Sequence, residues 1–316
     1  NDQGFLDRHF KLKAKGTNVR TEIIAGITTF VAMAYIIFVN PSILKEAGIP
    51  VEAAVAATIW SAALCTIAMG LFANLPVAMA PGMGLNAFFT FYVCKTVGLN
   101  WETALGAVFV SGLVFFMLTV TKLRQMIIDA VPMSLKSATV VGIGMFIAFV
   151  GLQSSNLIVE SPATKITLGT FSDPKVDLAL FGVLIIGALL ALKIRAAMLI
   201  GIVTVTVIGM IFGVTKAPEG ISDVVSFSFP GMGETFLKMD LVGAFHYGLI
   251  SIIFTFTIVE LFDNIGTLIG VTKAAGLVDK DGKIENCDRA LMTDSVGTLL
   301  SATMGTCAVT SYVESS

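Results

Sequence analysis

The chain has 316 residues, of which 55% are hydrophobic and only 13% are charged, and its formal net charge is −2. Soluble domains carry about a quarter charged residues, so this composition excludes a soluble enzyme with a membrane anchor and indicates a polytopic membrane protein. The sequence has no basic stretch suited to a phosphate backbone, which argues against a nucleic-acid partner. The four cysteines lack metal-ligand spacing and no Ser-His-Asp arrangement is visible, so we expect no metal, no cofactor and no enzyme activity.

Apolar runs of membrane-spanning length follow a polar, basic leader at residues 1–20. A hydrocarbon core needs about 20 apolar helical residues, and the first two expected spans are Thr21–Asn40, ended by Pro41, and Ala53–Asn74. The next segment, Leu75–Phe91, combines two prolines and two glycines with a short apolar run. This pattern predicts a broken helix, an extended piece followed by a half-helix, which is tolerated at membrane depth only where protein or a cavity surrounds it.

Further spans and polar loops alternate along the rest of the chain. The expected spans are Thr103–Val120, Ser137–Gln153, Asp177–Leu192, Ala196–Val214, a span that includes Leu241–Val259 and continues through Phe256–Gly270, and Ala290–Gly305. Polar loops are expected at Gln153–Val176, at Lys216–Asp240 with a short strand at Val224–Phe229, and at Val271–Arg289. If the leader is inside and the broken segment crosses the bilayer, most of the 20 Lys and Arg residues fall in inner segments. That bias predicts a multi-pass protein of the cell membrane with a cytoplasmic N-terminus.

Two carboxylates, Glu260 and Asp263, lie in the apolar stretch Phe256–Gly270. They are three residues apart, so on a helix they lie near one face. Ionisable groups within a span usually face the bundle interior or a water-filled cavity and mark function. The alternative is that both lie at a helix end and contact water.

The last stretch, Thr306–Ser316, resembles Leu75–Phe91 in kind. Small and β-prone residues precede a polar residue where a half-helix would begin, Glu314 in one stretch and Asn86 in the other. Thr28 and Thr29 in the first span precede Asn86 by about as many residues as Asp263 in the eighth span precedes Glu314. We therefore predict a seven-span repeat whose second copy starts at the eighth span and is inverted in the membrane, because seven is odd. On this pattern the chain stops inside the third element of the second copy.

A family resemblance rests on four spaced motifs: TTFVAMAYIIFVNP (Thr28–Pro41), APGMGLNAFF (Ala80–Phe89), FDNIGTL (Phe262–Leu268) and TSYVESS (Thr310–Ser316). Together they resemble the AzgA-like guanine–hypoxanthine–adenine permeases of the nucleobase–cation symporter group, which also holds the xanthine and uracil permeases. The resemblance covers essentially the whole chain. It implies an all-α polytopic membrane protein with fourteen spans in two inverted repeats of seven, with broken third and tenth spans. Residues 1–20 would be a cytoplasmic leader, 21–124 and 241–316 two parts of a core domain and 125–240 the first half of a gate domain, with the chain ending after the start of the tenth span.

The resemblance also implies a substrate site. The positions it assigns to binding the base come from spans one, three, eight and ten: Thr29, Ala32, Asn86, Phe88, Asp263, Thr267, Val313 and Glu314. Relatives that take uracil have an aromatic residue and a histidine where this chain has Ala87 and Thr267, and the small Ala87 would leave room for a bicyclic purine. Packing against lipid or core is the alternative for Phe88.

The predicted function is secondary active import of purine bases such as guanine, hypoxanthine or adenine by proton symport. An ionised carboxylate only accepts hydrogen bonds and a protonated one also donates, so we predict that Glu260, Asp263 and Glu314 carry the coupled proton or another cation. Two alternatives stay open: an inorganic-anion carrier or exchanger of the same architecture, which the acidic site disfavours, and a channel without coupling. The sequence leaves open the preferred purine, the coupling ion and a homodimer.

Overall fold

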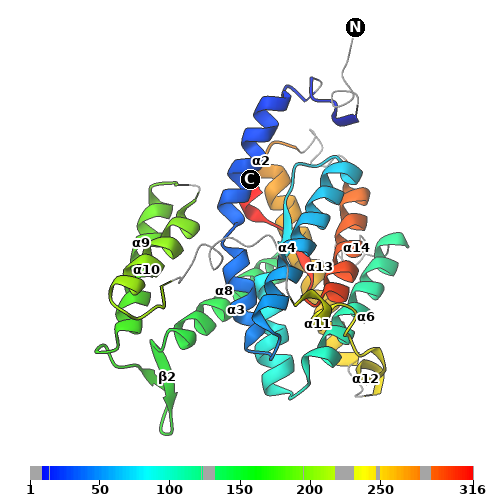
Figure 1. Cartoon of the computed structure of the whole chain (residues 1–316). Helices are drawn as coiled ribbons and strands as arrows, with labels where there is room; N and C mark the ends of the chain where they lie inside the picture. Colours follow the sequence, from blue (N-terminus) through cyan, green and yellow to red (C-terminus); the bar gives the residue numbers. More distant parts are fainter. Residues whose placement is uncertain are drawn as a thin grey trace.

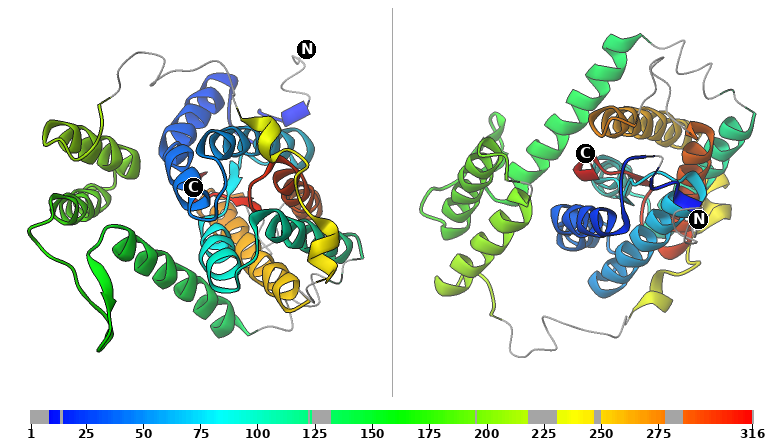
Figure 2. Two further views of the ribbon diagram at one scale, coloured as in Figure 1. Left: turned by 60° about the horizontal axis from the view of Figure 1, so that its bottom comes forward. Right: turned by 90° about the horizontal axis from the view of Figure 1, so that it is seen from above.

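The computed structural model describes residues 9–13, 15–121, 123, 132–194, 196–217, 231–246, 250–277 and 286–315. Helices from both ends of the chain form one bundle, and α9 (Pro174–Ala191) and α10 (Ala197–Ile211) form a separate pair at its side (Figure 1). The long helix α8 (Met133–Ser154) packs against α5 and α13 on the side of the bundle near the pair (Figure 2), and α10 itself contacts α2. This is the mostly helical architecture that the sequence predicts.

The first span consists of two helices, α2 (Val19–Met33) and α3 (Ile36–Lys45). The Asn18 side chain caps α2 by accepting a hydrogen bond from Thr21 N at 3.0 Å. The prediction that Pro41 ends this span was wrong, because Pro41 lies inside α3 and the break falls earlier, at residues 34–35. A proline removes one helical hydrogen bond and crowds the carbonyl four residues earlier. Pro41 lies inside a helix of only ten residues, whose first turn contains hydrogen bonds between residues three apart, such as Phe38 N to Tyr35 O at 3.0 Å.

The expected broken third element is present. The second span, α4 (Val51–Ala68), continues as the π-helix η1 (Met69–Ala73) and ends at Asn74, whose φ of 55° is left-handed. The chain then forms the short strand β1 (Met79–Pro81), and a half-helix follows as α5 (Met83–Ala87) and η2 (Phe88–Thr96). The half-helix therefore extends beyond the expected end at Phe91. The fourth span is α6 (Trp101–Val120).

The second part of the chain ends in a similar extended segment. It contains α12 (Leu241–His246), α13 (Ile250–Ala274), α14 (Cys287–Met304), the strand β4 (Val309–Ser311) and the short 3₁₀-helix η4 (Val313–Ser315). The strands β1 and β4 are fully buried and pair antiparallel, with Ala80 opposite Thr310. This pairing shows that both segments are extended, as the sequence predicts, and that they lie side by side. The inverted repeat and the division into core and gate domains stay predictions.

Two of the expected loops contain secondary structure, and the third starts later than expected. The hairpin of β2 (Ile158–Ser161) and β3 (Lys165–Leu168) occupies part of the expected polar loop at Gln153–Val176. The helix α13 continues to Ala274, so the expected loop start at Val271 was wrong. A short helix, α11 (Met232–Thr235), lies in the second loop, and the expected strand at Val224–Phe229 lies outside the described residues.

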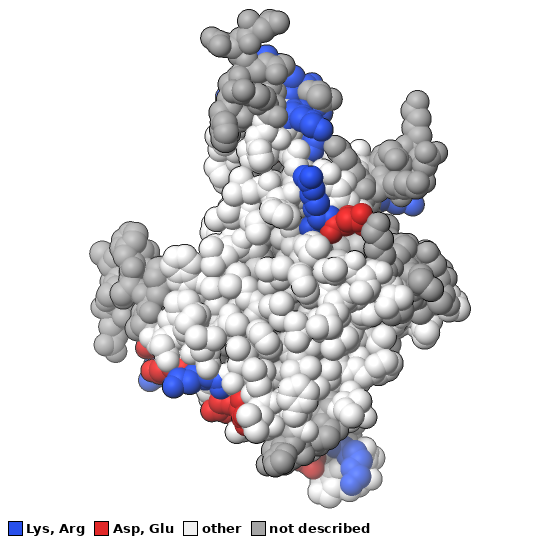
Figure 3. Space-filling model, turned by 90° about the vertical axis from the view of Figure 1, so that its right-hand side faces the viewer, with Lys and Arg blue, Asp and Glu red and all other residues white. Residues whose placement is uncertain are grey.

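The surface and the helix lengths suit a bilayer. Within the described residues, five helices are long and apolar enough to cross a membrane: Val19–Lys45, Val51–Ala73, Trp101–Val120, Pro174–Ala191 and Ile250–Lys273. On the face drawn in Figure 3, charged side chains lie toward the two ends and a broad uncharged surface separates them. The helix α14 is more polar than these five, because it carries the buried Thr293, Ser295, Thr298 and Ser301. Such a helix is packed among other helices and needs no lipid-facing apolar surface.

Candidate functional site

The carboxylate of Asp263 lies beside the crossing of β1 and β4. A Cβ added at Gly82 would lie 3.6 Å from Asp263 Oδ2 and 3.0 Å from Thr310 Cγ2. Gly82 is the residue before α5, and its N–H donates to Ala308 O at 2.9 Å. One turn after Asp263, Thr267 Oγ1 donates to Asp263 O at 2.8 Å and lies 3.5 Å from Thr310 Oγ1. The absence of a side chain at Gly82 thus lets a carboxylate and two hydroxyls from distant segments gather at the start of the half-helix.

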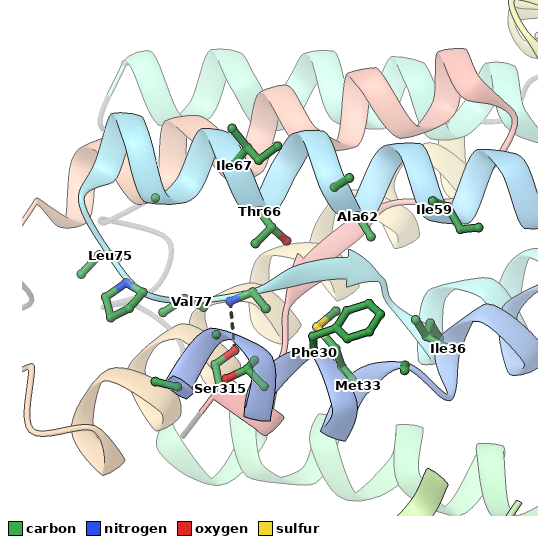
Figure 4. Close-up of a pocket in the computed structure, with 18 of the residues that line it drawn as sticks. Phe30, Met33, Ile36, Ile59, Ala62, Thr66, Ile67, Leu75, Val77 and Ser315 are labelled. Atoms are coloured by element: carbon green, nitrogen blue, oxygen red, sulfur yellow. Dashed lines mark hydrogen bonds between the residues drawn. The ribbon is translucent and has the colours of Figure 1, made fainter. Parts of the chain in front are cut away.

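Glu314 is held next to this crossing by residues of the first span and of the third element. Tyr35, at the break between α2 and α3, donates its hydroxyl to Glu314 Oε1 at 2.6 Å. Ala78 N donates to Ser315 Oγ at 3.0 Å, the bond drawn in Figure 4, and the Tyr312 hydroxyl donates to Pro81 O at 2.8 Å. These bonds fix η4 against the segment that leads into β1.

Residues assigned to spans one and three fall into different surroundings. Asn86 is fully buried on α5, where its Nδ2 donates to Asn40 Oδ1. Phe88 is half-buried, stacks on Tyr92 with ring centroids 5.1 Å apart, and meets Phe256 edge-on. Ala32 is buried on α2, and Thr29, one turn earlier, is half-buried. The structure therefore does not gather all the assigned residues around one open space, and Val313 is 58% exposed.

Glu260 occupies a polar seam between three helices. Its side chain on α13 is 1% exposed and accepts hydrogen bonds from Ser111 Oγ of α6 at 3.4 Å and from Thr298 Oγ1 of α14. This burial rules out the alternative that Glu260 lies at a helix end in contact with water. Hydroxyl donors satisfy the carboxylate there, as a buried charged group requires.

A cavity of about 590 Å³ lies between the first span and α4 (Figure 4). Its walls are mainly apolar, and the labelled lining residues are Phe30, Met33, Ile36, Ile59, Ala62, Thr66, Ile67, Leu75, Val77 and Ser315. Thr29 lines this cavity, whereas Asp263, Glu314 and Asn86 do not. Ligand sites need a few convergent polar groups that fix orientation. We therefore assign the candidate site to the crossing of β1 and β4 rather than to the cavity.

Four residues at or near the crossing were missed by sequence reasoning: Tyr35, Asn40, Gly82 and Thr310. Tyr35 and Asn40 are polar residues within an apolar span, and that property is the signal that could have found them. Gly82 and Thr310 lie within the two broken elements, but their pairing depends on a contact between segments far apart in the chain.

Comparison with known proteins places the chain among transporters. The model of the Permease family (Xan_ur_permease) matches residues 20–316. A putative permease of Methanocaldococcus jannaschii is 47% identical over 98% of this chain and 70% of its own length. The adenine permease AdeP of Escherichia coli is 43% identical over 99% of this chain and 69% of its own. The guanine/hypoxanthine permease PbuG of Bacillus subtilis is 42% identical over 97% of this chain and 71% of its own.

A solved structure supports the fold. The transmembrane domain of the cyanobacterial bicarbonate transporter BicA aligns with a TM-score of 0.61 over 94% of this chain and 76% of that domain. The sequence identity is 17%, so this similarity concerns the fold alone. Because the family model covers nearly the whole chain and close relatives are named as nucleobase permeases, the chain belongs to the Permease family of membrane transporters and not to an enzyme family.

Proposed function

We propose that this protein is a secondary active transporter that imports purine bases across the cell membrane. The names of its relatives, which include adenine and guanine/hypoxanthine permeases, support this substrate class. The observation that carries the proposal is the position of the Asp263 carboxylate, next to Gly82 and Thr310 at the crossing of two extended segments. A half-helix begins at this crossing, and transporters with broken helices bind substrates at such points.

The chemistry of the crossing suits a purine. The bases are flat and neutral, and their edges carry several N–H donors. An ionised carboxylate can accept two such donors at once, which is the role we propose for Asp263, with Glu314 as the second acceptor. As the stacking surface for the base we propose the aromatic ring of Phe88, which is half-buried at the start of η2 and stacks on Tyr92.

We further propose that the coupled ion is a proton carried by Asp263, Glu314 or Glu260. Protonation converts a carboxylate from a pure acceptor into a group that also donates. The base and the proton then bind with a mutual free-energy coupling, which is the thermodynamic basis of symport. The seam of Ser111 and Thr298 hydroxyls gives Glu260 partners in both protonation states, because a hydroxyl can donate or accept.

The gate would be the part of the chain that contains α9 and α10, moving against the bundle in alternating access. Their position at the side of the bundle in Figure 1 supports this division. The N-terminus would be cytoplasmic, in line with the charge bias of the loops.

Uptake by the full-length protein tests the function. In a strain without purine permeases, we expect uptake of guanine, hypoxanthine or adenine that a protonophore abolishes and that uracil does not inhibit. Purine uptake that persists with the protonophore and requires sodium would replace the proton by another cation. Uptake of bicarbonate or sulfate without any purine uptake would favour the anion-carrier alternative.

A further inference from the structure

A buried polar cluster around Asn40 joins the first span to three other segments. Asn40 lies on α3 with no exposed surface. Its Nδ2 donates to Thr58 Oγ1 of α4 at 2.8 Å and to Thr306 Oγ1, just before β4, at 3.0 Å. Its Oδ1 accepts from Nδ2 of Asn86 on α5. One amide thus connects both broken elements and the second span.

The hydrogen bonds of the cluster have a direction, and it starts at Thr58. The Thr58 hydroxyl donates its single proton to Ala54 O at 2.6 Å, so toward Asn40 it can only accept. Asn40 must therefore turn its NH₂ group to Thr58, which turns its carbonyl oxygen to Asn86. Asn86 must then present its own NH₂ group to Asn40. The orientation of both amides follows from one helix-backbone bond of α4.

This orientation leaves an acceptor of Asn86 unused. Asn86 Oδ1 is buried and has no hydrogen-bond partner among the described residues. The hydroxyl of Thr90, four residues further along the half-helix, is also buried without a partner in the described part of the chain. Buried polar groups in native proteins are nearly always paired, so an unpaired acceptor and an unpaired hydroxyl four residues apart on the half-helix point to a ligand that supplies the missing partners.

We propose that Asn40 is a positioning residue, which fixes the Asn86 amide so that its carbonyl oxygen accepts an N–H of the purine. The inference rests on the proposed function, because it assigns the donor to a purine base. It predicts that Asn40 affects substrate affinity only through Asn86. A residue that merely packs the bundle would instead change stability and transport rate independently of Asn86.

A double-mutant cycle in the full-length protein tests this inference. The Michaelis constant for hypoxanthine uptake is measured for Asn40→Leu, Asn86→Ala and the double variant, with transport rate and thermal stability recorded in parallel. We expect each single variant to raise the constant by about tenfold, the effect of losing one good hydrogen bond, and the double variant to match Asn86→Ala alone. Ser42→Ala is the matched control, since this exposed residue of the same helix donates its hydroxyl to the backbone carbonyl of Phe38, and it should leave the constant unchanged.

Additive effects in the double variant would overturn the inference, and so would an Asn40→Leu protein that loses stability with an unchanged Michaelis constant. If Asn40→Leu fails to fold, Thr58→Val replaces it in the cycle. This variant removes the acceptor that orients Asn40 and keeps the side-chain shape. It should raise the constant in the parent protein but not in the Asn86→Ala background, and the opposite pattern would reject the inference. A parent protein that takes up no purine would instead reject the proposed function.

Discussion

Replacing Asp263 by Asn changes one oxygen into an NH₂ group and keeps the side-chain shape. The Oδ2 atom lies at the start of the half-helix, 3.6 Å from where a Gly82 side chain would begin. The hydrogen bond from Thr267 goes to the backbone oxygen of Asp263 and not to its carboxylate, so the local structure of α13 is kept. Losing one partner of a buried, hydrogen-bonded charge costs about 2–5 kcal/mol. We therefore expect the dissociation constant for a purine to rise by roughly thirtyfold to a few thousandfold.

Titration calorimetry of the purified full-length variant with hypoxanthine measures this loss, and a thermal-unfolding curve reports whether the fold is kept. Asp173→Asn is the matched control. The Asp173 side chain caps α9 by accepting from Lys175 N at 3.0 Å, and asparagine caps helices about as well as aspartate. Affinity of the Asp263→Asn variant equal to that of the parent protein would refute the assignment of the substrate carboxylate.

Three more substitutions probe the neighbourhood of the crossing. Glu260→Gln should preserve purine binding and flatten the pH dependence of uptake, and an unchanged pH profile would move the coupling role to Asp263 or Glu314. Tyr35→Phe removes the hydroxyl that bonds Glu314 and should weaken equilibrium purine binding by roughly tenfold to a hundredfold, since bonds to charged groups contribute about 1.5–3 kcal/mol. Parental affinity in this variant would show that Glu314 is not part of the site. Gly82→Ala would place a methyl 3.0 Å from Thr310 Cγ2, closer than the roughly 3.5–4.0 Å of a normal contact. This substitution should lower both the stability of the protein and its affinity for a purine. The control Gly142→Ala places its methyl in open space on α8 and should lower neither.

The helical spans and both extended segments were predictable from local patterns. Apolar runs of span length set the positions of α4, α6 and α9 to within a few residues. The prolines and glycines before α5 indicated an interrupted helix, and the β-prone residues before η4 indicated a second one. The prediction of a helix end at Pro41 was wrong because a proline usually ends a helix, whereas here α3 contains it.

The contacts that build the candidate site were not predictable from local patterns. Tyr35 and Glu314 are separated by 279 positions and Asn40 and Thr306 by 266, and no periodicity in one segment specifies a partner so distant. Glu260 and Asp263 were expected near one face of a helix, yet Glu260 bonds to α6 and α14 while Asp263 lies beside β1 and β4. The difference arises because α13 is surrounded by other elements, so even nearby positions on it meet different neighbours.

Competitive binding to the purified full-length protein tests the central claim most directly. Radiolabelled hypoxanthine is bound at equilibrium and challenged with unlabelled guanine, bicarbonate or sulfate. A purine site at the crossing of β1 and β4 predicts displacement by guanine, no displacement by either anion, and loss of binding in Asp263→Asn. Displacement by bicarbonate or sulfate, or undiminished purine binding in that variant, would contradict it.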